Sequence, residues 1–375
     1  MYYFDNAATT KVLKEVADEA RDCMLNLYGN PSSLHKLGLE AENKMTASRK
    51  TIADVFGCKE KEIIFTSGAT ESTNIAIFGA AKKGKRKGNK IITTEIEHAS
   101  VKHCIDELEN MGFCIVRIKS RDGRYYAEDI IDAVDEDTIL VSVMHVNNEN
   151  GLILPIEKIA TGVKNKNNDV VVHVDGVQSF CKLPMDLSKS KIDLMSVSGH
   201  KINAPKGIGA LYIRDGVKIP PHSFGGDHEL GIRPGTEALP LIAAFASAAK
   251  INMTNMQKSI EHYKELKSHL LSRIKDNDEI KLNSKEDSVP YIVNISIEGI
   301  GSEIMLHFLE SKGFCVSSGS ACSKSKKSGV LPHMGYSRER ELTAIRISFS
   351  TENSKEQLDM LIDAILQGQE NIMKK

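Results

Sequence analysis

Apolar and polar residues follow two patterns that alternate along the chain, and each pattern predicts one kind of element. Short apolar runs between turn residues predict buried strands, and longer stretches with apolar residues three or four apart predict helices. We expect strands at 62–66, 90–94, 114–118, 139–145, 170–174, 192–197, 206–212, 291–297, 315–317 and 344–349. We expect helices at 12–28, 34–56, from the turn 67–72 to 80, after 100, and at 127–134, 257–275, 303–311 and 355–366. This alternation predicts an α/β protein with a mainly parallel sheet and helices on both faces.

The pattern changes near residue 252, where a long charged helix begins to replace the alternation. A chain of 375 residues also exceeds one ordinary core. We therefore expect a large domain over 14–256 and a smaller α+β domain formed by 1–13 and 257–375. The longest apolar run, 239–249, contains Pro240 and is too short to span a bilayer.

Composition changes this picture mainly by exclusion. Lys and Arg number 49 against 50 Asp and Glu, so no global field draws nucleic acid or a membrane surface. The first residues lack the basic and apolar regions of a signal peptide, and we expect a cytoplasmic protein. The basic run 82–87 predicts a solvated loop, with a docking patch for tRNA or a sulfur-carrying partner as the alternative.

The chain has 7 cysteines and no pair or cluster at zinc-binding spacing, which argues against disulfides and a structural metal. Six of them lie in apolar surroundings and are expected to be buried: Cys23, Cys58, Cys104, Cys114, Cys181 and Cys315. Cys322 instead lies among small and basic residues, which favour the reactive thiolate. An incidental exposed cysteine is the alternative.

The most informative chemical signal is an acid and a lysine that follow neighbouring strands. Asp175 ends the run 170–174, and Lys201 follows the run 192–197. A carboxylate at the end of a buried strand is costly unless it meets a fixed cation. Pyridoxal phosphate (PLP) requires this pair, because the acid keeps the pyridine nitrogen protonated and the lysine amine bonds to the aldehyde. The alternative is a turn-capping aspartate and an unrelated loop lysine.

Two further features fit a ligand of this kind. The small-residue turn 67–72 opens a helix, so the backbone at Ala69 and Thr70 predicts a phosphate seat, or else an ordinary capped helix start. Arg346 lies in the apolar run 343–348, where a charged side chain is costly unless it has a partner. The partner could be an amino-acid carboxylate bound through two hydrogen bonds, or an acidic side chain in a structural salt bridge.

The segments 173–179 (HVDGVQS) and 198–201 (SGHK) resemble the cysteine desulfurases of the class V aminotransferase family. The likeness extends from 5–10 to 345–348, and 317–322 (SSGSAC) matches the group with a mobile catalytic loop. The resemblance implies a PLP-dependent transferase of fold type I. It also implies an L-cysteine desulfurase, in which Cys322 receives the substrate sulfur as a persulfide while alanine is released.

The resemblance also implies a set of site residues. The catalytic residues would be Lys201, Cys322 and His98. The PLP-binding residues would be Ala69, Thr70, His98, Asn148, Asp175, Gln178, Ser198, His200, Lys201 and Thr236. The substrate-binding residues would be Asn30, Asn148 and Arg346. On the residues alone, the alternatives are a helix cap for His98 and turn residues for Asn30 and Asn148.

The implied partners are a second copy of the chain and a sulfur acceptor. The glycine-rich segment 225–237 would cross a dimer interface, so that Thr236 completes the partner subunit's site. The acceptor would be an iron–sulfur scaffold, a tRNA-thiolation enzyme or a thiamine-pathway protein. Cys322 would at most be a transient iron–sulfur ligand. The chain departs from the family in a shorter loop after Cys322, a short C-terminal tail and Asn150 in a usually apolar position.

Two other functions remain open on the sequence. One is an ordinary aminotransferase of the same family in which Cys322 is idle. The other is a sulfur-relay or scaffold subunit that has lost its cofactor, which the intact pair of Asp175 and Lys201 argues against.

Overall fold

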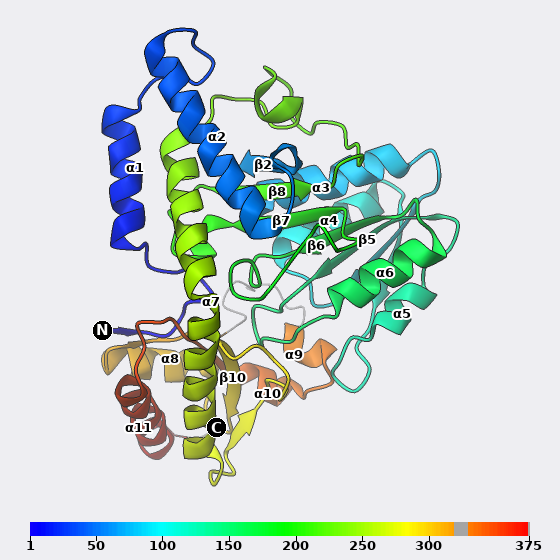
Figure 1. Cartoon of the computed structure of the whole chain (residues 1–375). Coiled ribbons are helices and arrows are strands. Elements are labelled where there is room, and N and C mark those ends of the chain that lie inside the picture. The colour runs from blue at the N-terminus through cyan, green and yellow to red at the C-terminus, as the bar shows by residue number, and fades with distance from the viewer. Residues whose placement is uncertain (319–328, 374–375) are drawn as a thin grey trace.

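A seven-stranded mixed sheet in the order β2-β8-β7-β6-β5-β3-β4 forms the centre of the larger region (Figure 1). The computed structural model describes residues 1–318 and 329–373. The strands are β2 (Ile63–Thr66), β3 (Lys90–Thr94), β4 (Cys114–Ile118), β5 (Thr138–Met144), β6 (Val171–Asp175), β7 (Leu194–Ser198) and β8 (Gly209–Ile213). Strand β8 is antiparallel to both of its neighbours, and the pairs from β7 to β4 are parallel. The mainly parallel sheet that the sequence predicts is therefore present.

Helices cover both faces of this sheet, as the strand pattern requires (Figure 1). They are α2 (Lys36–Phe56), α3 (Ala69–Gly84), α4 (Ala99–Asn110), α5 (Ala127–Asp132) and α6 (Ile156–Lys166). Helix α1 (Lys14–Asn26) lies outside this layer and packs against the helix at 239–274 (Figure 1). Successive strand residues point to opposite faces. Val141 and Val143 accordingly pack in one buried cluster with Phe56, while Leu140 packs with Ile77 and Ile105 in another.

Helix α7 (Leu239–Ile274) is one continuous helix of 36 residues that joins the two regions of the molecule (Figure 1). Its first part packs through Phe245 in the core of the large sheet, and its second part packs through Leu270 in a separate core. The expected helix start at 257 is therefore wrong. Pro240 does not interrupt the helix, because it lies in the first turn, where no backbone N–H is needed.

The C-terminal region is built on a three-stranded antiparallel sheet of β12 (Ala344–Ser348), β10 (Ile292–Ile297) and β9 (Ile280–Leu282). Its helices are α8 (Ser302–Ser311), α9 (Val330–His333), α10 (Arg338–Leu342) and α11 (Lys355–Asn371). The N-terminus belongs to this region, since β1 (Tyr2–Tyr3) pairs in parallel with β11 (Phe314–Cys315) and Phe4 is buried in its core. The expected strand at 315–317 is replaced by β11 and a single bridge between Ser317 and Arg346.

The surface differs from expectation in two places. Cys114 is exposed, so its predicted burial is wrong, and the reason is that β4 is the edge strand of the large sheet. Cys23, Cys104 and Cys181 are buried, and Cys58 and Cys315 are half-buried. Helix α3 extends to Gly84, so the basic run 82–87 starts within a helix, although its charged side chains are exposed as expected.

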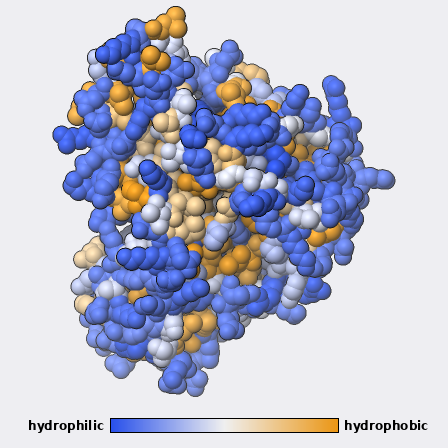
Figure 2. Space-filling view, viewed as in Figure 1, coloured by the Kyte–Doolittle hydropathy of each residue, from blue (hydrophilic) through white to orange (hydrophobic). Residues whose placement is uncertain are grey.

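Hydrophilic side chains cover most of the face in Figure 2, and apolar ones gather near the junction of the two regions. A cavity of about 670 Å³ is lined there by residues that include Ile153, Leu183, Ile260 and Leu271. Within 1–318 and 329–373, no helix combines the length and the apolar character needed to cross a bilayer. The same residues contain no cluster of His, Cys, Asp and Glu arranged to hold a metal ion.

Candidate active site

The acid and the lysine singled out above lie at one edge of the sheet. Strand β6 ends at Asp175, and β7 leads into a short 3₁₀ turn, η2 (Gly199–Lys201). The two strands are parallel neighbours, so both side chains lie beyond their carboxyl ends, where open α/β sheets bind ligands. Asp175 is only 6% exposed, and its carboxylate accepts a hydrogen bond from the N–H of Val177 at 3.0 Å. Burial raises the pKa of Asp175, and that N–H and the charges of His98 and Lys201 oppose the rise.

The amine of Lys201 is held by backbone from the N-terminal segment. Its Nζ donates to the carbonyl oxygens of Ala7 and Ala8, each at 2.7 Å. Burial and the charge of Arg346 lower the pKa of Lys201 to about 8, while Asp5 and Asp175 act in the opposite direction. A lysine with such a pKa is partly neutral near pH 7, and the neutral amine is the form that attacks an aldehyde.

A cavity of about 540 Å³ adjoins this amine and is lined by residues that include Tyr3, Thr9, Lys182 and Lys201. Lys182 was not among the predicted site residues. Burial and the charge of Lys201 lower the pKa of Lys182 to about 7. Its amine also lies 5.1 Å from the centre of the Tyr291 ring, in cation–π range.

Gln178 shares a backbone acceptor with Lys201. Its Nε2 donates to the carbonyl oxygen of Ala7 at 2.9 Å, and its Oε1 is buried with no hydrogen-bond partner in the described chain. A buried polar atom without a partner is uncommon and marks a place for a ligand group. The sequence places Gln178 three residues after Asp175, and the structure keeps the two on the same loop.

The start of α3 and the end of β7 form a bare cradle. Helix α3 begins at Ala69 after Gly68, which has φ +154°, and a Cβ built on Gly68 would meet only the Ser198 Oγ, at 3.9 Å. The first-turn N–H groups of Ala69 and Thr70 have no intrahelical acceptor, and the helix dipole adds positive potential there. This cradle suits an anion such as a phosphate.

Two histidines lie near this edge. Nδ1 of His200 lies 3.2 Å from the Thr9 hydroxyl, and burial together with the charges of Lys201 and Lys206 lowers the pKa of His200 to about 4. His98 directly precedes α4 and is its N-cap, because its Nδ1 accepts from the N–H of Ser100 at 3.2 Å. The surrounding protein lowers the pKa of His98, and the nearby charge of Asp175 opposes this, which places His98 within electrostatic reach of Asp175.

Arg346 lies on β12 and is only 4% exposed. Its Nη2 donates to Asp5 Oδ1 at 2.6 Å, and its Nη1 donates to the backbone oxygen of Asn148 at 2.9 Å. The Nε of Arg346 is buried and has no partner among the described residues. A salt bridge, one of the two expected reasons for this arginine, is therefore present, and the Nε–H of the guanidinium remains unused.

The loop after β5 contains the two asparagines that the sequence singled out. Asn148 contributes its backbone oxygen to Arg346, and its side chain is half-buried. Asn150 is fully buried, yet its Oδ1 accepts from the N–H of Leu152 at 3.0 Å. Its own N–H donates to Asn147 Oδ1 at 3.2 Å. The polar Asn150 is therefore accommodated by hydrogen bonds in place of apolar packing.

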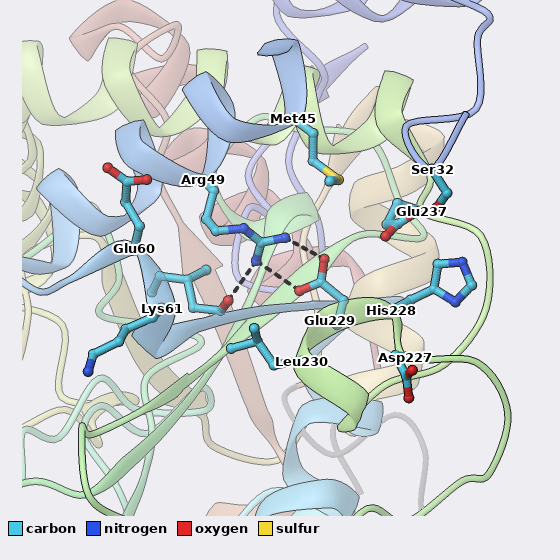
Figure 3. Close-up of a pocket in the computed structure, with 11 residues that line it drawn as sticks. Ser32, Met45, Arg49, Glu60, Lys61, Asp227, His228, Glu229, Leu230 and Glu237 are labelled. Atoms are coloured by element: carbon cyan, nitrogen blue, oxygen red, sulfur yellow. Dashed lines mark hydrogen bonds and ion pairs between the residues drawn. The ribbon is translucent and has the colours of Figure 1, made fainter. Parts of the chain in front are cut away.

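Asn30 and Thr236 lie away from the Lys201 cluster in the single chain. Asn30 is exposed and forms a turn in which its Oδ1 accepts from the N–H of Ser32 at 2.9 Å. Thr236 is also exposed. Ser32 and Glu237 line a separate cavity of about 530 Å³, shown in Figure 3, in which Arg49 forms a two-pronged ion pair with Glu229.

Cys322 lies outside the described residues. The chain before it pairs with β12, because the N–H of Arg346 donates to the Ser317 oxygen at 2.5 Å and the N–H of Ser317 donates to the Arg346 oxygen at 3.1 Å. Ser317 is therefore adjacent to Arg346, five positions before Cys322 in the sequence.

The structure adds Glu97, for which the sequence suggested no role. One of its carboxylate oxygens accepts from the hydroxyl of Thr94 at 2.5 Å and from the N–H of Met144 at 3.1 Å. Its other oxygen is buried and has no partner among the described residues. Burial, reinforced by the charge of Asp175, raises the pKa of Glu97 to about 8. The signal that could have found it is an acid directly before His98, in the short segment 95–97 that follows β3.

A mainly parallel sheet with helices on both faces, an acid after one strand and a lysine after the next define the architecture of PLP-dependent transferases of fold type I. The family model for aminotransferase class-V matches residues 2–361, and the chain belongs to this family.

Relatives and solved structures agree with this assignment. The chain is 40% identical to a "NifS/IcsS protein homolog" of Lactobacillus delbrueckii subsp. bulgaricus, over 97% of this chain and 96% of the relative. It is also 40% identical to "Cysteine desulfurase IscS" of Escherichia coli K12, over 97% of this chain and 91% of the relative. A solved "NIFS-LIKE PROTEIN" superposes with a TM-score of 0.94 and 36% identity, covering 99% of this chain and all of the other.

Proposed function

We propose that this protein is a PLP-dependent cysteine desulfurase, which converts L-cysteine to L-alanine and transfers the sulfur to Cys322. The observation that carries the proposal is the placement of Lys201 and Asp175 at one sheet edge, with the amine pKa lowered to about 8 and Arg346 close enough to contribute to that shift. The 40% identity to a cysteine desulfurase over nearly the whole chain supports the choice of substrate.

The residues at this edge fit PLP. Asp175 is a buried carboxylate suited to the pyridine nitrogen, and Lys201 supplies the amine that bonds to the aldehyde. The bare start of α3 at Ala69 and Thr70, together with Ser198 and His200, suits the phosphate. The side chains of Gln178, His98 and Asn148 would contact the ring and its oxygen. When bound, PLP supplies an electron-withdrawing ring that lets the substrate Cα lose its proton and the sulfur depart.

Residues of this chain would orient the substrate, accept its proton and attack its sulfur. Arg346, with Asn148 and Asn30 as further candidates, would orient the substrate carboxylate. The Lys201 amine would accept the Cα proton, because a pKa of about 8 lies near the working pH. The Cys322 thiolate would attack the substrate sulfur, forming a sulfur–sulfur bond as the carbon–sulfur bond breaks. L-Cysteine and one enzyme thiol thus give L-alanine and one enzyme persulfide, with no other reactant.

A second copy of the chain would complete the site. Thr236 of the partner subunit would contact the phosphate, and the exposed position of Thr236 in the single chain supports this. Leu230 in the segment 225–237 is 66% exposed and Phe224 just before it is 83% exposed, which suits an interface. The sulfur acceptor would be an iron–sulfur scaffold or a tRNA-thiolation enzyme, with no membrane or direct nucleic-acid contact. A cytoplasmic setting would keep Cys322 reduced.

The division into a large domain over 14–256 and a small domain of 1–13 and 257–375 is part of the same proposal. Two separate buried clusters support it, one containing Phe245 and the other containing Phe4 and Leu270. The substrate site would then lie between Lys201 of the large domain and Arg346 of the small one.

The replacement Cys322→Ala tests the function. The purified protein should be yellow from bound PLP and should release alanine and sulfide from L-cysteine in the presence of a reductant. Cys322→Ala should keep the chromophore and lose sulfur transfer, and Cys114→Ala should change neither, because Cys114 lies on the edge strand β4. Unchanged desulfuration by Cys322→Ala would contradict the persulfide role. A wild-type protein that transfers amino groups but releases no sulfide from L-cysteine would favour an ordinary aminotransferase.

A further inference from the structure

The guanidinium of Arg346 is held on two of its nitrogens and open on the third. Asp5 accepts from Nη2 at 2.6 Å and the Asn148 backbone oxygen accepts from Nη1 at 2.9 Å. The Arg346 side chain is 5% exposed, so Asp5 is the counter-ion that makes its burial tolerable. The Nε–H is shielded from water and donates to nothing in the described chain.

A guanidinium carries five N–H donors in a planar fork. One carboxylate can be gripped across Nε–H and the adjacent Nη2–H, and another acceptor can take the remaining hydrogen of Nη2. Asp5 accepts from Nη2 and not from Nε, so the Nε–H remains available. A substrate carboxylate on the Nε edge would supply the partner that Nε lacks.

Asp5 is also tied to the catalytic lysine through a short stretch of backbone. Ala7 and Ala8, two and three residues further on, accept both hydrogen bonds of the Lys201 amine. The N–H of Ala7 donates to the Ser348 hydroxyl at 2.8 Å, which fixes this stretch against β12. Residues 5–8 thus span from the arginine to the lysine and set their spacing.

We propose that Asp5 is a positioning residue for the substrate: it holds Arg346 so that the Nε edge of the guanidinium receives the α-carboxylate of the amino acid, at a spacing from Lys201 set by residues 5–8. The proposal rests on the proposed function for the identity of the substrate class, an α-amino acid. In a competing role, the Asp5 carboxylate would bind Arg346 at the position of the substrate carboxylate and would be displaced when the substrate binds.

Asp5→Asn tests this, because it removes the charge and keeps the shape. The PLP-loaded protein is titrated with L-alanine and, separately, with ethylamine, which has the same amine without a carboxylate, and binding is followed by visible absorbance. We expect L-alanine to bind about 10-fold more weakly or worse, since a charge-assisted hydrogen bond is lost behind the arginine. The affinity for ethylamine should change by about twofold or less. KM for L-cysteine should rise more than kcat falls.

The matched control is Asp363→Asn, which removes the exposed partner of Arg273 in the same region and should alter neither titration. Equal losses of affinity for L-alanine and ethylamine would overturn the proposal. Tighter binding of L-alanine by Asp5→Asn would also overturn it, in favour of the role in which the substrate displaces Asp5. If Asp5→Asn melts far below the wild type, the comparison is repeated with Asp5→Glu, which keeps the charge and should retain L-alanine affinity to within a few-fold. Wild-type protein that binds L-alanine yet releases no sulfide would refute the desulfurase function and leave the role of Asp5 intact.

Discussion

The Lys201 amine donates to the carbonyl oxygen of Ala7 at 2.7 Å, so a residue near the N-terminus holds the reactive group in the middle of the chain. The same carbonyl accepts from the side chain of Gln178. Backbone carbonyls carry no net charge, so they raise the pKa of the amine less than a carboxylate acceptor would. Burial and the charge of Arg346 lower that pKa to about 8, although the charges of Asp5 and Asp175 act in the opposite direction.

The first prediction concerns the pH dependence of PLP capture. Protein stripped of PLP should recombine with it faster as the pH rises through about 8, because the neutral form of Lys201 is the nucleophile. The rate should level off above that pH and fall about 10-fold for each unit below it. Recovery of the visible absorbance after mixing with PLP measures the rate.

The control for this experiment is Lys189→Ala, an exposed lysine paired with Asp186, which should leave the profile unchanged. A recombination rate that keeps rising to pH 10 would show that the amine has an ordinary lysine pKa. Lys201→Ala should abolish the borohydride-stable attachment of PLP.

The second prediction is that Asp175→Asn retains PLP but lowers kcat about 100-fold or more. A neutral amide cannot hold the proton on the pyridine nitrogen, so the ring loses the charge that draws electrons from the substrate. Removing a buried carboxylate whose pKa is raised by burial should not lower the melting temperature of the PLP-free protein. Steady-state alanine formation and thermal melts measure the two effects.

Asp186→Asn serves as the comparison, because Asp186 is a surface acid that pairs with Lys189. A kcat for Asp175→Asn within about twofold of the wild type would contradict the assignment of Asp175 to the ring nitrogen.

The sequence predicts the pair of Asp175 and Lys201 because each follows an apolar strand, and strand ends in a parallel sheet converge. It does not predict Asp5, because the contact with Arg346 joins residues 341 positions apart and the N-terminal segment has no periodic pattern. The apolar pattern also predicts the wrong start for α7, at 257. One helix passes from the core around Phe245 to the core around Leu270, and its polar pattern changes midway. Local pattern therefore predicts elements well, and long-range contacts between their ends poorly.

The third prediction concerns Glu97, whose pKa is raised to about 8. Its folded-state pKa lies above the ordinary value of 4.5, so the native state binds more protons than the unfolded state between those values. The stability that the protonated acid contributes is complete below about pH 4.5 and is lost as the pH rises through 8. Glu97→Gln, which stays neutral, should remove this loss, and its advantage over the wild type should grow by a few kcal/mol between pH 5 and 9, by about 1.4 kcal/mol per pH unit at most.

Urea unfolding of the PLP-free protein at several pH values measures this difference. Glu370→Gln, which replaces an exposed acid near the end of α11, should run parallel to the wild type at every pH. If Glu97→Gln also runs parallel to the wild type, then Glu97 is ionised at neutral pH and the buried oxygen without a partner requires another explanation.

The fourth prediction concerns the ion pair in Figure 3. Glu229 is buried, accepts from both Arg49 Nη groups and from the N–H of Phe65 at 2.7 Å, and has φ +47°, in the left-handed region. Glu229→Ala would leave the half-buried Arg49 guanidinium without its counter-ion, and we expect a loss of about 3 kcal/mol in the free energy of unfolding. The segment 225–237 would lose its hydrogen bond to Phe65 of β2, so the proposed dimer should dissociate at lower dilution. Lys87→Ala, which removes an exposed pair with Asp169, should cost about 0.5 kcal/mol or less. Thermal melts measure the loss of stability, and sedimentation at several concentrations measures dissociation of the proposed dimer. A Glu229→Ala protein that dissociates like the wild type would show that the segment 225–237 does not form the subunit interface.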